Sequence, residues 1–212
     1  MDNQGFPSII TSLNLLKRAE EIIPSLTQTL AKGPSQHVRG ISPCFIECAH
    51  GSVVTDVDGN NFIDCSMGIG PISIGYSSNI VDDSIKTQLS KGITFSLMHP
   101  LEVEVSELIS SIIPNAEAVR FSKTGCDVTS AAVRLARAFT GRNKVLTCGY
   151  HGWHDWSICN TTRCNGIPSF NSEIVTSFKY NDISSLESVL DKDVAAVIME
   201  PMLFEYPELD FL

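Results

Sequence analysis

The fold is indicated most clearly by residues 119–155, which read VRFSKTGCDVTSAAVRLARAFTGRNKVLTCGYHGWHD. Residues 118–122 form a short apolar run that predicts a strand. Residues 126–139 have the apolar spacing of an amphipathic helix that ends before Gly141, and residues 144–148 predict a second strand. A strand, a helix and a second strand at this spacing are typical of a parallel sheet with helices on its faces. The stretch therefore predicts an α/β fold.

The same alternation continues towards the carboxyl end of the chain. Asp182 is placed to cap a helix through Leu190, and residues 194–199 form an apolar, β-branched strand. On the amino-terminal side, helices are predicted over residues 79–89 and 100–113. The apolar positions of the second helix recur every three or four residues, and we expect them to be buried: Leu101, Val105, Leu108, Ile109 and Ile112.

The beginning of the chain has a different pattern. Ser12 predicts the N-cap of a helix that runs through Ile23. Residues 45–63 predict a small β-meander that contains a turn from Asp56 to Asn60. The oxygen atoms of this turn are possible calcium ligands, but the later acidic ligands of an EF-hand are missing. A plain hairpin turn is the simpler interpretation.

Composition excludes several classes of protein. The chain has 212 residues, with 24 acidic and 15 basic side chains, a formal charge of −9 and an isoelectric point near 4.9. Binding along nucleic acids or to anionic membrane surfaces requires clustered Lys and Arg, so we expect no nucleic-acid or membrane partner. No apolar run approaches the roughly 20 residues that span a bilayer, and the first residues are unlike a secretory signal. We therefore expect a soluble, cytoplasmic protein.

The seven cysteines are irregularly spaced and odd in number, as is typical of reduced, structural thiols. A zinc site is the alternative, because two thiolates and two imidazoles can complete a tetrahedron. No C-x₂-C pair supports it. The candidate ligands are close in sequence: Cys148, His151, His154, Cys159 and Cys164.

The loop of residues 122–127 joins the first predicted strand to its helix. Small and hydroxylated residues at a helix N-terminus leave backbone N–H groups free to bind an anion, which the helix dipole also favours. Gly125 allows close approach to the backbone, and the Thr124 hydroxyl is a further donor. The loop matches neither of the common glycine-rich nucleotide motifs. An ordinary capped helix with Asp127 in its first turn is the alternative.

Two further features follow predicted strands. Residues 150–154, Tyr-His-Gly-Trp-His, come directly after the strand 144–148, and Glu200 follows the strand 194–199. Ligands of open α/β sheets bind beyond the carboxyl ends of the strands, so these residues and the Thr124 loop are expected to face one site. An aromatic ring there can stack on a planar heterocycle. A packing cluster near the surface is the alternative for residues 150–154, and Glu200 can equally cap a neighbouring loop.

At these points the sequence resembles the class III pyridoxal-phosphate-dependent aminotransferases, and among them the glutamate-1-semialdehyde 2,1-aminomutase-like branch. Nearly the whole chain takes part in the resemblance, and the order and spacing of the motifs are more specific than any motif alone. The matching segments are residues 13–24, 57–64, 70–75, 101–104, 134–142, 150–152 and 200–201. The resemblance implies the large domain of a fold-type-I pyridoxal-phosphate transferase. Residues 1–75 are then an N-terminal helix and meander, and residues 76–212 a partial cofactor-binding domain.

The resemblance also implies where the cofactor, pyridoxal 5'-phosphate, is bound. Thr124, Gly125 and Cys126 occupy the positions of the family's Ser-Gly-Thr phosphate cup, where Cys126 replaces a hydroxyl by a thiol. Asp127 stands where the family has Glu.

The same resemblance implies that the ring of the cofactor lies against residues 150–154, which follow the strand 144–148. Tyr150 is implied to stack on the pyridine ring, with His151 and Gly152 shaping that wall. Glu200 is implied to support the pocket from the end of its strand. No metal is expected.

The family's Schiff-base lysine and the acid at its pyridine nitrogen are implied to lie beyond Leu212, so no catalytic residue is expected in this chain. Neither Lys123, in the phosphate loop, nor Lys144, at the start of a strand, has a matching context. The resemblance thus describes a fragment of an enzyme, inactive alone, that belongs to a homodimer and moves an amino group between a small-molecule amino donor and a carbonyl acceptor. A non-catalytic product that retains the phosphate loop is the alternative, and a Cys/His metal module is another.

Two departures from the aminomutase pattern concern the substrate. The aminomutase's carboxylate-binding arginine aligns near Pro34, with Arg39 five residues later, and its pocket asparagine aligns near Glu205. These departures favour a substrate other than glutamate-1-semialdehyde, such as a sugar-like amine or carbonyl.

Overall fold

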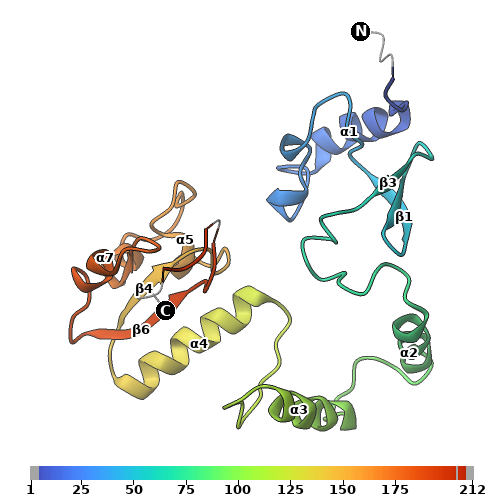
Figure 1. The fold of residues 1–212 in the computed structure, drawn as a ribbon. Helices are drawn as coiled ribbons and strands as arrows, with labels where there is room; N and C mark the ends of the chain where they lie inside the picture. Colours follow the sequence, from blue (N-terminus) through green and yellow to red (C-terminus); the bar gives the residue numbers. More distant parts are fainter. Residues whose placement is uncertain (1–4, 204, 209–212) are drawn as a thin grey trace. The chain divides into compact units, whose positions relative to one another are not determined.

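The computed structural model describes residues 5–203 and 205–208, and the chain forms two compact units that divide between Met98 and His99 (Figure 1). The boundary expected between residues 75 and 76 stays a prediction about the family's domains.

The first unit contains a helix, a small sheet and a second helix. The strands pair antiparallel in the order β1-β2-β3, which confirms the predicted meander. Two short 3₁₀ turns connect the first helix to the sheet. The elements are α1 (Ile10–Ile22), η1 (Leu30–Lys32), η2 (Pro34–Gln36), β1 (Ile46–His50), β2 (Val53–Asp56), β3 (Asn61–Ile63) and α2 (Asn79–Leu89).

The N-terminus of α1 is capped by a residue from the meander. The helix begins at Ile10, so the prediction that Ser12 is its N-cap is wrong. The carboxylate of Asp58 accepts hydrogen bonds from the backbone N–H of Thr11, at 2.7 Å, and of Ser12, at 2.9 Å. The Ser12 hydroxyl instead accepts from the backbone N–H of Cys44. A cap supplied from a distant turn leaves no signal in the local sequence.

The turn from Asp56 to Asn60 is held by its own side chains. Asp56 is fully buried, and one carboxylate oxygen accepts from the N–H groups of Asp58, at 2.9 Å, and Asn60, at 2.8 Å. Its other oxygen accepts from the Asn60 side chain at 2.8 Å. The carboxylate oxygens of Asp56 and Asp58 thus accept hydrogen bonds from N–H groups. This supports a plain hairpin turn rather than a calcium-binding loop.

The second unit is an α/β unit around a parallel sheet. The strand order is β5-β4-β6, and both pairs are parallel, as the sequence predicts. Strands β4 and β6 have the predicted bounds, whereas β5, with three residues, was not predicted. The elements are α3 (Pro100–Ile112), α4 (Gly125–Thr140), β4 (Lys144–Cys148), α5 (Asp155–Ile158), α6 (Phe170–Ile174), β5 (Val175–Ser177), α7 (Ile183–Glu187) and β6 (Val194–Met199).

Two local predictions in this unit need correction. Residues 118–122 are not a strand, because no strand in the described part of the chain pairs with them. An apolar run becomes a strand only where a neighbour satisfies its backbone groups. The helix after Asp182 forms with the predicted cap, through a bond from the Ser185 N–H, but α7 ends at Glu187, before Leu190.

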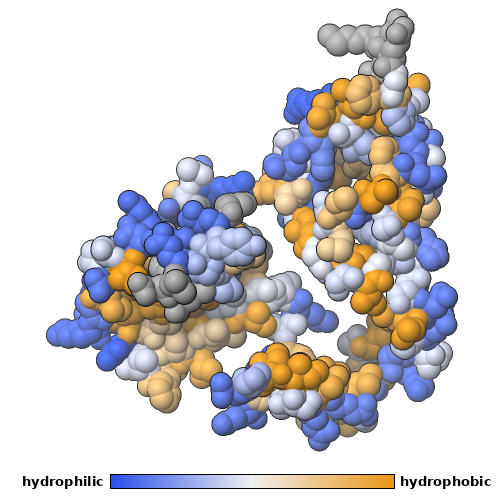
Figure 2. All heavy atoms as spheres, in the orientation of Figure 1, coloured by the Kyte–Doolittle hydropathy of each residue, from blue (hydrophilic) through white to orange (hydrophobic). Residues whose placement is uncertain are grey.

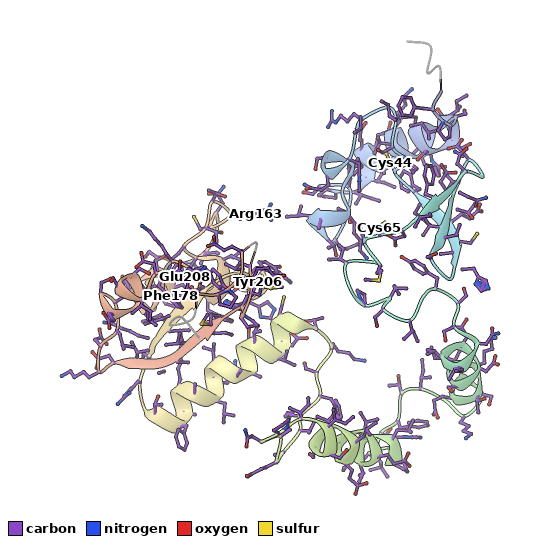
Figure 3. The ribbon with its side chains drawn as sticks, in the orientation of Figure 1. Cys44, Cys65, Arg163, Phe178, Tyr206 and Glu208 are labelled. Atoms are coloured by element: carbon purple, nitrogen blue, oxygen red, sulfur yellow. The ribbon has the colours of Figure 1, made fainter. Side chains whose placement is uncertain are left out.

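Strand β4 carries the core of the second unit on both of its faces. Val145 packs with Val133 of α4, Trp156, Cys159 and Val175. Leu146 and Cys148, on the opposite face, pack with Phe178 (labelled in Figure 3) and Val194. Alternate side chains of a strand point to opposite faces, so a strand buried on both reads as a continuous apolar run.

The apolar face of α3 is exposed, contrary to prediction. Leu101 is 43% exposed, Leu108 57% and Ile112 67%, and Figure 2 shows hydrophobic side chains gathered on this helix. Helical periodicity identifies which side of a helix is apolar but not what covers it. Among the described residues, no helix combines the length and the hydrophobicity needed to cross a bilayer.

Candidate functional site

The N-terminus of α4 is closed by a reciprocal pair of side chains. The Thr124 hydroxyl accepts from the Asp127 N–H at 3.2 Å, and the Asp127 carboxylate accepts from the Thr124 N–H at 3.1 Å. This capping box is the structure predicted by the ordinary-helix alternative. The αL residue Gly141, with φ of 68°, ends the helix.

The cap leaves two backbone donors of the first turn available. Within the described residues, the N–H groups of Gly125 and Cys126 make no hydrogen bond. A Cβ atom built on Gly125 meets nothing within 4 Å, so the space beside this turn is open. Free N–H groups at the positive end of a 16-residue helix favour an anion.

The side chains of the same turn point elsewhere. The Thr124 hydroxyl donates to the Asp127 carboxylate at 2.9 Å, so its proton is directed into the cap. The Cys126 sulfur accepts from the Trp153 N–H at 3.4 Å. In this conformation the turn offers an anion its backbone, whereas the expected Thr124 side-chain donor is engaged.

The loop after β4 lies against the end of β6 through Glu200. The Glu200 N–H continues the ladder by donating to the Cys148 carbonyl at 3.1 Å, and the Glu200 carboxylate accepts from the Tyr150 N–H at 3.0 Å. Gly149, with φ of 92°, makes this approach possible, because a Cβ there would lie 2.2 Å from a Glu200 carboxylate oxygen. The Tyr150 side chain is 67% exposed.

The other side of this loop lies against the first turn of α4. The Thr129 hydroxyl is 2.8 Å from the His151 carbonyl oxygen. Gly152, with φ of 113°, lies so close to Cys126 that an added Cβ would be 2.6 Å from its sulfur. Loop and helix are therefore in contact, and the three features singled out in the sequence meet beyond the carboxyl ends of β4 and β6.

The side chains of the zinc alternative do not converge. His151 Nε2 bonds the Cys148 carbonyl at 2.9 Å, and His154 Nδ1 bonds the Ser130 hydroxyl at 2.7 Å. Burial raises the pKa of the Cys148 thiol, with a further rise from the Glu200 charge, and burial also raises the pKa of Cys159. Zinc binds thiolates, which these shifts disfavour. Within the described ranges, no group of three or more His, Cys, Asp or Glu is arranged for a metal, and all seven cysteines are free.

A cavity of about 480 Å³ lies beside α4 and borders the last residues of the Tyr150 loop, Trp153 and His154. Its lining includes Val133, Arg134 and Arg137 of α4 with Trp153 and Asn171. None of the six residues expected to bind the cofactor lines it. The candidate site is therefore the open surface around Gly125 and Tyr150.

Two residues of the site were missed in the sequence. Gly149 could have been found from the sequence, because a glycine between a strand and a functional loop indicates a positive φ or the close approach of another group to the backbone. Thr129 lies one turn beyond Cys126 and carries no local signal, since its partner is 22 residues away.

Comparison with known proteins identifies a family. The sequence model of the family described as aminotransferase class-III matches residues 35–205. A 3-aminobutyryl-CoA aminotransferase of Cloacimonas acidaminovorans is 36% identical over 195 residues, which are 90% of this chain and 46% of that protein. A glutamate-1-semialdehyde 2,1-aminomutase of Saccharolobus islandicus is 34% identical over 200 residues, which are 87% of this chain and 47% of that protein.

A solved structure shows the same similarity in three dimensions. The PLP internal aldimine form of the FumI protein of Sphingopyxis sp. MTA144 has a TM-score of 0.80 at 30% identity, over 88% of this chain and 45% of that chain. The chain thus spans about half the length of the relatives that it matches.

Proposed function

The chain belongs to the class III aminotransferases, and from this membership we propose that it forms the phosphate- and ring-binding side of a pyridoxal 5'-phosphate site. The reaction of the complete enzyme is amino-group transfer between a small-molecule amino donor and a carbonyl acceptor. The α/β fold around a parallel sheet agrees with the fold-type-I transaminases among its structural neighbours.

The observation that carries the proposal is the proximity of a free helix N-terminus and an exposed aromatic loop. The N–H groups of Gly125 and Cys126 have no partner among the described residues, and the space at the Cβ position of Gly125 is open. The loop that carries Tyr150 contacts the same turn through Cys126 and Thr129. A phosphate ester on a planar heterocycle requires both kinds of surface, an anion cup and a ring wall. The residues present therefore fit the cofactor of this family.

Each residue has a defined task in this site. Gly125 and Cys126 donate backbone hydrogen bonds to the phosphate, while Thr124 and Asp127 keep the helix end in place. Tyr150, next to His151, would stack on the ring of the bound cofactor, and Glu200 holds the Tyr150 backbone through its N–H group. The bound cofactor supplies the electron sink for reactions at the substrate's amino-bearing carbon.

Amino-group transfer also requires a lysine and an acid near the pyridine nitrogen. Lys144 forms an ion pair with Asp191, and Lys123 is an exposed residue of the phosphate loop. We assign neither to catalysis and propose that both groups lie outside these 212 residues in the complete enzyme. We further propose that the chain alone is inactive and that the complete enzyme is a cytoplasmic homodimer.

The substrate is proposed to differ from glutamate-1-semialdehyde. Pro34 and Glu205 occupy the positions at which the resemblance implies an arginine and an asparagine. A carboxylate substrate loses its cationic partner when that arginine is missing. A sugar-like amine or carbonyl needs no such partner.

Titration of the chain with pyridoxal 5'-phosphate tests the proposal. We expect saturable, one-to-one binding, followed by the intrinsic fluorescence of the two tryptophans, Trp153 and Trp156. Inorganic phosphate should compete, and pyridoxal, which lacks the phosphate, should bind more weakly. Borohydride treatment should fix the cofactor on no single lysine. Absence of saturable binding would contradict the cofactor site, and stoichiometric zinc in the purified chain would favour the metal alternative.

A further inference from the structure

The loop of residues 149–153 is clamped from two sides. On the β6 side, the Glu200 carboxylate accepts from the Tyr150 N–H at 3.0 Å. On the α4 side, the Thr129 hydroxyl is 2.8 Å from the His151 carbonyl oxygen. The residue that would stack on the cofactor ring is thus bracketed by one contact at its own N–H group and one at its neighbour's carbonyl group.

Thr129 joins the clamp to the phosphate cup. Its hydroxyl is also 3.1 Å from the carbonyl oxygen of Cys126, three residues earlier on the helix. A threonine on a helix often bonds such a nearby carbonyl, but the shorter contact here reaches a loop 22 residues further along the chain. The Thr129 hydroxyl therefore lies within reach of two carbonyl oxygens, that of Cys126, whose N–H group belongs to the cup, and that of His151, which follows Tyr150. Its single proton is directed to the nearer one, on His151.

We infer that Thr129 is a positioning residue, which sets the Tyr150 ring at a fixed place relative to the phosphate cup. The inference deepens the proposed function and rests on it. Thr129 touches neither phosphate nor ring in this arrangement; it acts through the His151 carbonyl, and Glu200 acts through the Tyr150 N–H.

The cup itself does not depend on the Thr129 hydroxyl. The first turn of α4 is held by the capping box between Thr124 and Asp127. Removing the Thr129 hydroxyl leaves that cap intact but deprives the half-buried His151 carbonyl of its donor. An unpaired polar group is costly when shielded from water, so the loop shifts to find another partner. The ring wall then moves while the phosphate donors stay in place.

The test compares two ligands on two variants. Thr129→Val keeps the shape of the side chain and removes the hydroxyl, whereas Thr129→Ser keeps the hydroxyl. We expect Thr129→Val to weaken binding of pyridoxal 5'-phosphate about tenfold, the scale of one lost hydrogen bond. Binding of inorganic phosphate, which uses the cup alone, should change less than about twofold, and Thr129→Ser should restore cofactor affinity.

A purely structural role of Thr129 predicts a different result. It would lower the affinity for both ligands together, and that outcome, like unchanged cofactor binding in Thr129→Val, would overturn the inference. Failure of the unmodified chain to bind the cofactor would overturn the proposed function instead. The clamp is then tested without ligand by amide hydrogen exchange: Thr129→Val should accelerate exchange of the Tyr150 N–H, and unchanged exchange would contradict the clamp.

Discussion

Gly149 is the residue that allows Glu200 to reach the backbone of the Tyr150 loop. Its φ of 92° is reserved in practice for glycine, and the space of a Cβ is already filled by the Glu200 carboxylate. The carboxylate can move aside, but only by giving up the Tyr150 N–H. The backbone geometry of the loop therefore depends on two residues together, Gly149 and Glu200, which are 51 residues apart in the chain.

Gly149→Ala should reduce cofactor binding more than a comparable glycine substitution elsewhere. Gly166→Ala is the matched control, because Gly166 has φ of 84° and no atom within 4 Å of an added Cβ. Both variants lose about 1–2 kcal/mol from backbone strain, which urea denaturation would measure. Only Gly149→Ala should also weaken pyridoxal 5'-phosphate in the fluorescence titration. Equal effects of the two variants on binding would contradict the role of Glu200.

Asp64 provides a pH-dependent test in the first unit. The Tyr76 hydroxyl donates to its carboxylate at 2.7 Å and lowers the pKa of Asp64; burial opposes this shift, and the N–H groups of residues 66–68 reinforce it. Because the pKa is lower in the folded state, the stabilisation is complete above the ordinary value of about 4. It is lost as the pH falls through the folded value.

Tyr76→Phe should raise the pKa of Asp64 towards its ordinary value, as measured by NMR titration of the side-chain carboxyl carbon. The stability difference between the two proteins should shrink as the pH falls from about 4 towards the lowered pKa of the folded state, below which both states are protonated. Asp191, whose pKa is lowered chiefly by its bond to Lys144, is the internal control and should titrate unchanged. An unchanged Asp64 pKa would show that the tyrosine bond does not set it.

For the candidate site, the sequence predicted which residues lie at the helix start and after the strand, but not where their side chains point. The sequence placed Thr124, Gly125 and Cys126 at a helix start and Tyr150 after a strand, and the structure has both. The anion-binding interpretation treated the Thr124 hydroxyl as a free donor, whereas this hydroxyl turns into the cap. Nothing in the sequence indicated that the Cys126 sulfur faces Trp153. Side-chain direction depends on contacts with distant segments, which local patterns do not contain.

Among the elements, those with a continuous apolar run or a clear helical periodicity were predicted best. Strands β4 and β6 and helix α2 have the predicted bounds. The predicted strand over residues 118–122 failed, and β5 was missed, because pairing with a neighbour decides both cases. The start of α1 was misplaced because its cap, Asp58, comes from the meander.

Asp58→Ala should loosen the first turn of α1 without unfolding the meander. The N–H groups of Thr11 and Ser12 lose their acceptor, so their hydrogen exchange should accelerate several-fold. Asp83→Ala is the control, because that exposed acid forms an ion pair with Lys86 on its own helix. Exchange that stays slow at Thr11 and Ser12 in Asp58→Ala would show that another group caps the helix.

At the scale of the whole molecule, the chain exposes much more apolar surface than is usual for a monomer. The α3 face of Leu101, Val105, Leu108 and Ile112 is one example, and Leu135 and Phe139 of α4, at 71% and 89% exposure, are another. Large contiguous apolar surfaces mark interaction sites or lead to association. Sequence analysis predicted the amphipathic pattern correctly but not its exposure.

The purified chain should therefore associate as its concentration rises. The double substitution Leu108→Glu and Ile112→Glu should reduce this association in sedimentation velocity experiments. Ser110→Glu with Ser111→Glu adds the same charge to α3 but leaves the apolar face intact, and it should reduce association less. A chain that stays monomeric at all accessible concentrations would contradict the prediction.

In the proposed site, the first turn of α4 and the Tyr150 loop together hold pyridoxal 5'-phosphate. Backbone amide NMR during a cofactor titration tests it residue by residue. We expect saturable shifts that are largest at the N–H groups of Gly125 and Cys126 and at residues 150–152, and inorganic phosphate should shift the signals of Gly125 and Cys126 alone. Shifts confined to exposed lysines, with residues 124–126 and 150–152 unmoved, would contradict it.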